Sequence, residues 1–161
     1  MADWRTPVFD RTREDVEHAI KTIADWVNSD VSVNPLAVHD LKGCLNVSDI
    51  NRIEGNIEYL TEMLNSYHYL LGISTKSWTN AGLPNETDIS RILNNVRTII
   101  DNYYQQSNAP PVPSRLQGYE EVNAVEENLL LIKELLDCMV ASFKKSGKVQ
   151  SGGTRLLPIR R

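Results

Sequence analysis

The chain of 161 residues has little of what most enzymes and membrane proteins need. It has two cysteines and three histidines, and neither set has the spacing of a metal or redox site. No apolar run reaches the roughly 18 residues of a transmembrane helix, and the first residues lack the apolar core of a secretory signal. Glycine-rich phosphate loops and nucleophile motifs are also missing. We therefore expect no catalytic site, no cofactor, no metal and no membrane span.

Acidic and basic residues are unevenly distributed along the chain. The net charge of −4 and the pI near 5.4 argue against general nucleic-acid binding. The last residues differ, because six basic residues and no acid follow Ser142: Lys144, Lys145, Lys148, Arg155, Arg160 and Arg161. The sequence predicts a helical domain over residues 1–147 and a basic tail over 148–161. This tail is either a solvated terminus or a contact for an acidic partner, a membrane surface or weakly bound nucleic acid.

One motif occurs three times between residues 48 and 129. The copies are SDINRIEGNI at 48–57, TDISRILNNV at 87–96 and EEVNAVEENL at 120–129, and a weaker copy starts at Asp15. In each strong copy an acid precedes an asparagine by seven residues. The pairs are Asp49 with Asn56, Asp88 with Asn95, and Glu121 with Asn128. A period of about 30–40 residues indicates stacked supersecondary units.

Apolar residues recur within and after each copy at alternating steps of three and four, which is typical of helices that pack in bundles. The sequence therefore predicts an all-α fold, a four-helix bundle-like array of repeated helices with long linkers. The four capping residues stand three positions before each repeated acid: Thr12, Asn46, Asn85 and Gly118. The acid can bond back to the backbone N–H of the capping residue. Glycines predict the end of the second helix at Gly72 and of the fourth at Gly147.

Five polar or aromatic residues are candidates for structural or partner contacts. Asn56, Asn95 and Asn128 fall just beside the apolar stripe, where an amide can bond to a neighbouring helix or to the backbone of a linker. Trp4 and Trp78 lie outside the predicted helices. They either plug the end of the bundle or remain exposed as anchors for a partner, since tryptophan is favoured at interface hot spots.

The segment SDINRIEGNIEYL at 48–60 resembles a helical module of tail and other virion-associated proteins from phages and prophages of Gram-positive bacteria. Other matching features are Trp4, the DRTREDV stretch at 10–16, the Leu45-Asn46 turn, and Lys76, Trp78, Leu83 and Pro84. Two copies depart from the central motif. Ser90 and Leu93 replace its Asn and Glu in one copy, and Ala124 replaces its Arg in the last.

This resemblance implies a non-enzymatic structural protein of the virion, in the tail or baseplate, that is assembled in the bacterial cytoplasm with other virion subunits as partners. The long apolar stripe of the second predicted helix makes a homo-oligomer a further option. Two other functions stay open. One is a helical adaptor or regulatory binding module, and the other, less favoured, is a small enzyme on a helical scaffold.

Overall fold

A computed structural model describes residues 2–29, 41–80, 82 and 84–149, with side chains up to residue 143. These residues form four α-helices and no strand. The helices are α1 (Arg13–Val27), α3 (Val47–Ser66), α4 (Glu86–Asn102) and α5 (Tyr119–Val149). The prediction of an all-α fold with four helices is confirmed.

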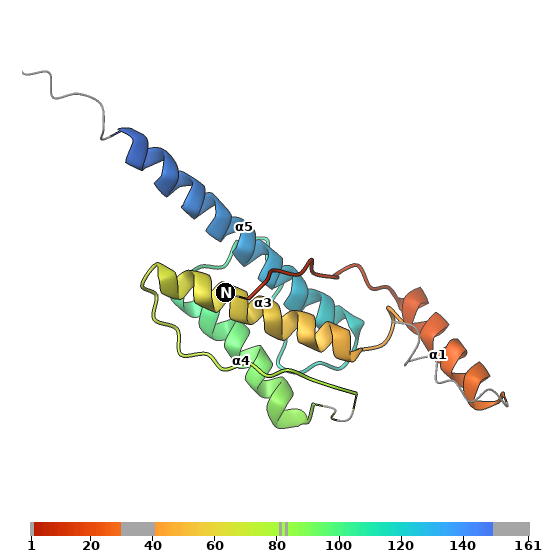
Figure 1. Ribbon diagram of the computed structural model, residues 1–161. Helices are drawn as coiled ribbons and strands as arrows, with labels where there is room; N and C mark the ends of the chain where they lie inside the picture. Colours follow the sequence, from red (N-terminus) through yellow and green to blue (C-terminus); the bar gives the residue numbers. More distant parts are fainter. Residues whose placement is uncertain (1, 30–40, 81, 83, 150–161) are drawn as a thin grey trace, which may run out of the picture.

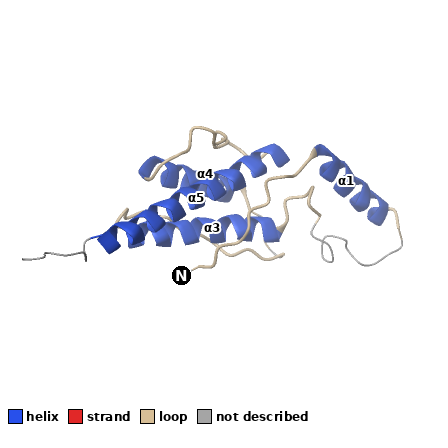
Figure 2. Ribbon diagram, turned by 90° about the horizontal axis from the view of Figure 1, so that it is seen from above, coloured by secondary structure: helices blue, strands red, loops and turns tan. Residues whose placement is uncertain are grey.

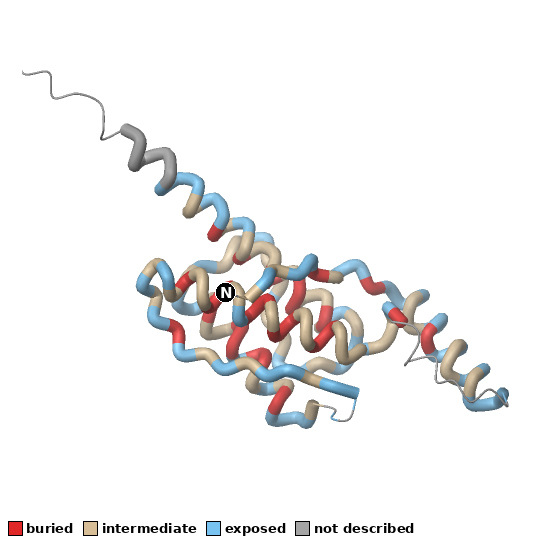
Figure 3. The backbone as a smooth tube through the Cα atoms, in the orientation of Figure 1, coloured by how far each residue is buried: buried red, intermediate tan, exposed pale blue. Residues whose placement is uncertain are grey.

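Helices α3, α4 and α5 lie side by side and enclose the apolar core (Figures 1 and 2). Ile57, Val96 and Leu129, one from each helix, are fully buried. The buried residues gather where the three helices face one another (Figure 3). Because these are the helices that carry the strong motif copies, the repeat in the sequence corresponds to the bundle itself.

The three bundle helices run in the same direction. Arg52 of α3 bonds to Glu126 of α5, and Arg91 of α4 bonds to Glu54 of α3, so residues of the first halves meet. At the other end, the Tyr69 ring beyond α3 contacts Tyr103 beyond α4, with 5.4 Å between ring centroids. Parallel neighbours require the chain to return along the bundle after each helix. This requirement explains linkers longer than the usual 2–8 residues between helices.

Each helix begins as the repeated acid predicts, because the acid accepts a hydrogen bond from the backbone N–H of the capping residue. The distances are 2.8 Å from Thr12 to Asp15, 3.0 Å from Asn46 to Asp49, 3.3 Å from Asn85 to Asp88 and 2.8 Å from Gly118 to Glu121. The acid thereby satisfies one N–H group at the helix start that has no partner within the helix. The acids therefore stabilise helix starts.

These capping acids make stability depend on pH. A hydrogen bond from Lys76 and one from the Asn85 N–H hold the pKa of Asp88 below its usual value. A depressed folded-state pKa gives stability that is present above the unfolded pKa, near 3.9, and lost as the pH falls through the folded pKa. We expect Asp88→Asn to lower the urea midpoint at pH 7, and the difference from wild type to shrink below about pH 4.

The exposed Asp101 in the last turn of the same helix provides the control, and Asp101→Asn should not lower the midpoint at either pH, because an acid is unfavourable at a helix C-terminus. A difference between wild type and Asp88→Asn that stays constant from pH 7 to pH 3 would contradict this account of the cap.

The end of α3 differs from the prediction. The helix ends at Ser66, not at Gly72, and Tyr67 caps it. His68 and Leu70 then take positive φ angles of 68° and 56°, a region that ends a helix. The Asn65 side chain holds the turn by bonding to both the N–H and the C=O of Leu71. The positive φ angles and the Asn65 hydrogen bonds therefore end the helix before Gly72, without a glycine.

The end of α5 also lies beyond the predicted position. The helix continues through Gly147 to Val149, two residues into the predicted tail. An internal glycine lowers helix stability by only about 1 kcal/mol relative to alanine, so it need not end a helix. The rest of that tail, 150–161, lies outside the described residues. Helix α5 extends well past the ends of α3 and α4 (Figure 1).

Helix α1 lies apart from the other three (Figures 1 and 2). Only Ala19 of its residues is buried. Its first turn packs against the turn at 41–45 that leads into α3, where a Cβ atom placed on Gly43 would lie 2.1 Å from the Asp15 carbonyl oxygen. Lys42 adds ion pairs with Asp10 and Asp15, at 2.9 and 3.6 Å.

Gly43→Ala should therefore detach α1 without disturbing the bundle, because the clash is with backbone atoms that cannot move independently. We expect faster hydrogen exchange across 13–27, with protection in α3, α4 and α5 retained. Gly72→Ala is the matched control, since nothing lies within 4 Å of a Cβ at that position. Equal exchange rates in the two variants would contradict the expectation.

Candidate partner-binding grooves

Three extended segments run back along the bundle, each in a groove between two helices. We call them the N-terminal strap (residues 2–11), the middle strap (71–78) and the third strap (105–113). The N-terminal strap bonds to α3 and α5, the middle strap to α3 and α4, and the third strap to α4 and α5. Every groove of the parallel bundle is thus occupied by one strap.

Asparagine side chains hold the straps by imitating a peptide group. Asn56 accepts from the Arg5 N–H at 2.9 Å and donates to the Arg5 C=O at 2.8 Å. Asn51 pairs with Trp78 in the same way, at 2.8 and 2.9 Å. Asn123 pairs with Arg11 at 3.3 and 2.9 Å. One amide offers both a donor and an acceptor, so it satisfies an extended backbone as a neighbouring strand would.

The three asparagines singled out in the sequence all bond to strap backbone. Asn56 binds Arg5, Asn95 donates to the Ser74 C=O at 2.9 Å, and Asn128 donates to the Pro110 C=O at 2.8 Å. All three are buried. Asn95 and Asn128 thus bond to a linker, one of the two predicted contacts, whereas Asn56 bonds to the N-terminal segment.

Sequence reasoning missed Asn51 and Asn123. Both stand two residues after the repeated acid, and Ser90 occupies that position in the second strong copy, TDISRILNNV. The signal was therefore present in two of the three strong copies. Asn65, which binds Leu71, lies outside the motif and carries no comparable signal.

Four charged side chains form a buried cluster between α3, α5 and the N-terminal strap. Arg11 bonds to Asp49 at 2.8 Å and to Glu126 at 3.1 Å, and Arg52 bonds to the same two carboxylates. Glu126 is 1% exposed and also accepts from the Val8 N–H at 2.8 Å. Its hydrogen bond is the main cause of the raised pKa of Arg52. Two cations and two anions balance inside the protein, which burial requires.

The motif places an arginine three residues after the acid and a glutamate five after it, and these positions meet between helices. Arg52 of α3 bonds to Glu126 of α5, and Arg91 of α4 bonds to both oxygens of Glu54 in α3. The remaining combination is Ala124 of α5 with Leu93 of α4. Two of the three departures noted in the sequence, Leu93 and Ala124, thus occupy the equivalent positions of α4 and α5, where apolar residues stand in place of an ion pair.

The two candidate tryptophans lie in grooves along the side of the bundle, not at its end. Trp78 is half-buried and donates through Nε1 to Glu54 at 3.1 Å, with the Lys76 ammonium 5.7 Å from its ring centroid. The Trp4 ring lies 5.6 Å from that of Tyr59. Both pack on the core because the straps that carry them run beside α3. Both side chains are half-buried, so they pack within the bundle and keep part of their surface accessible.

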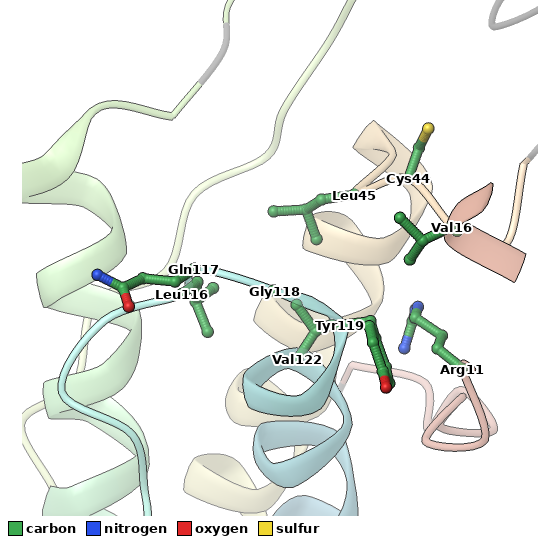
Figure 4. Close-up of a pocket in the computed structure, with 10 residues that line it drawn as sticks. Arg11, Val16, Cys44, Leu45, Leu116, Gln117, Gly118, Tyr119 and Val122 are labelled. Atoms are coloured by element: carbon green, nitrogen blue, oxygen red, sulfur yellow. The ribbon is translucent and has the colours of Figure 1, made fainter. Parts of the chain in front are cut away.

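A small hollow of about 290 Å³ lies between the start of α5, the 41–45 turn and the first turn of α1 (Figure 4). Arg11, Cys44, Leu116 and Tyr119 are among its lining residues. Burial and the nearby Asp49 raise the pKa of the Cys44 thiol. A raised pKa keeps the thiol protonated at neutral pH, and the thiol is a poor nucleophile. The hollow offers a small apolar surface without an activated group.

Two further properties bear on the class of site. Among the helices of the described residues, none is both long and apolar enough to span a bilayer. Over the same part of the chain, no group of three His, Cys, Asp or Glu side chains is arranged to hold a metal ion.

Comparison with known proteins found no matching family model, curated protein or solved structure. The grooves and the bundle end are therefore interpreted from their own geometry.

Proposed function

We propose that this chain is a structural subunit of a phage or prophage virion, in the tail or baseplate, that acts by protein–protein assembly. The resemblance of residues 48–60 to virion-associated helical modules supports the proposal. The residues of that segment are the ones that build the strap architecture: Asp49 caps a helix, Asn51 and Asn56 hold straps, and Arg52 and Glu54 pair between helices.

The observation that carries the proposal is an exposed apolar surface at the C-terminal end of the bundle. Leu70, Tyr104 and Phe143 are 81%, 57% and 58% exposed, and they lie where α3 and α4 end and α5 continues. We call them the end surface. Exposed apolar side chains at one end of the bundle favour a protein–protein contact there.

The test is a pull-down of the tagged full chain from its own host after prophage induction, with co-purifying proteins identified by mass spectrometry. We expect tail or baseplate subunits with wild type and a loss of most of that recovery with Leu70→Gly. Glycine readily adopts the positive φ of Leu70, so this variant removes the side chain without disturbing the turn. Ile20→Ser, at a 62% exposed residue of α1, is the control and should retain the partners.

Recovery of host regulators or nucleic acid without any virion subunit would overturn the proposal and favour the adaptor function. Virion subunits that are retained equally by Leu70→Gly would leave the assembly function standing but remove the end surface from it.

A further inference from the structure

The N-terminal strap binds its groove as a separate peptide would. Backbone groups of Arg5, Val8 and Arg11 bond to side chains of α3 and α5. Pro7 is buried and Trp4 packs on the core. The Arg11 guanidinium then completes the charged cluster with Asp49 and Glu126. We propose that this strap exchanges between copies of the chain, so that residues 2–11 of one copy occupy the α3/α5 groove of a second copy.

The N-terminal strap differs from the other two straps in how it is connected to the bundle. The middle strap lies between α3 and α4, and the third strap between α4 and α5, with only short turns on either side. Each of these two straps is therefore joined at both ends to a helix of its own bundle. The N-terminal strap is joined to α3 through α1 and residues 28–46 instead. Helix α1 lies apart from the bundle, so it can move with the strap without breaking the core, and its contacts with Lys42 and Gly43 are then made with the second copy (Figure 2).

The length of this connection allows a neighbouring groove to be reached. Helix α1 spans about 22 Å at 1.5 Å per residue. Residues 28–46 add 19 positions to this connection.

Closed and exchanged forms make the same contacts, so protein concentration decides between them. An empty groove is the unfavourable alternative, because Asp49 and Glu126 would keep only Arg52 as a cationic partner and the Trp4 side chain would lose its packing on the core. A strap that leaves one groove is therefore replaced by another strap. The exchange would link copies of the chain, and it goes beyond the proposed virion function because it needs no other protein.

Complementary variants of the full chain test the exchange. Arg11→Gln weakens the strap and leaves the groove intact, whereas Glu126→Gln weakens the groove and leaves the strap intact. A mixed dimer restores one native strap–groove pair, and neither variant can form that pair alone. Each variant is labelled at the exposed Cys138 in a Cys44→Ser background, and energy transfer between donor- and acceptor-labelled copies is measured.

We expect the mixed dimer to exceed either self-dimer by about tenfold, the ratio that a coupling energy typical of contacting residues produces. A synthetic peptide of residues 1–12 in excess should abolish the transfer, and the same peptide with Arg11→Gln should not. Where a variant alone has lost its helical circular dichroism, mixing should restore it.

Three outcomes would overturn the proposal. These are equal transfer in all mixtures, no transfer in the mixed sample while both variants are folded, and two unfolded variants that stay unfolded together. Because the experiment uses the purified chain alone, its failure would not affect the pull-down result, nor would failure of the pull-down affect this one.

Discussion

Glu126→Gln is expected to lower the free energy of unfolding by about 3–5 kcal/mol, the cost of removing one partner from a buried ion pair. Glu126 is 1% exposed and accepts hydrogen bonds from Arg11, Arg52 and the Val8 N–H. A glutamine has one acceptor oxygen in place of two, and its amino group would face two guanidinium groups. Since domains of this size are usually stable by 5–15 kcal/mol, urea unfolding should detect the loss easily.

Glu134→Gln makes the same chemical change at an exposed site on the same helix. It should alter the unfolding free energy by less than about 0.5 kcal/mol, as surface substitutions usually do. If Glu126→Gln also stayed within that range, the cluster would have to be open to water, contrary to its burial.

Arg91→Met is expected to cost about 3 kcal/mol, because it leaves the Glu54 carboxylate buried with Trp78 as its remaining donor. The double variant Arg91→Met/Glu54→Gln should recover much of that loss, since a neutral amide can still accept from the Trp78 Nε1. The chain itself contains a precedent, because Ala124 and Leu93 stand at the equivalent positions of the third interface. Urea unfolding of the two single variants and the double variant measures the coupling.

Arg115→Met is the matched control, because Arg115 is 70% exposed at its side chain and lies 4.0 Å from Glu86. Exposed pairs contribute about 0–1 kcal/mol. A strictly additive double variant would show that Arg91 and Glu54 do not interact energetically, despite their hydrogen bonds.

Periodicity predicted the helices because the apolar stripe and the capping acid both act locally. The start of α4, for example, depends on Asn85 and Asp88, which are three residues apart in the sequence. The asparagine seven residues after the acid was also visible, and its position beside the apolar stripe predicted a bond to a neighbouring helix or to a linker. Interactions within one or two helical turns are what a single sequence displays most clearly.

Contacts between segments that are distant in the sequence could not be predicted from local periodicity. Nothing local relates Arg11 to Glu126 or Trp78 to Glu54, and the straps have no periodicity that would reveal their path. The end of α3 was missed for a similar reason, since Asn65 stops it by bonding to Leu71. The parallel direction could have been inferred from the linkers, whose length suits a return along the bundle.

The common direction of α3 and α4 has an electrostatic consequence at the end surface. Each helix carries about half a negative charge at its last carbonyl groups, and two helices that end together add these partial charges. Neither has a basic residue in its last turn to offset them. The surface around Leu70 and Tyr104 is therefore electronegative as well as apolar. The partner that fits it best presents an aliphatic or aromatic side chain surrounded by lysine or arginine.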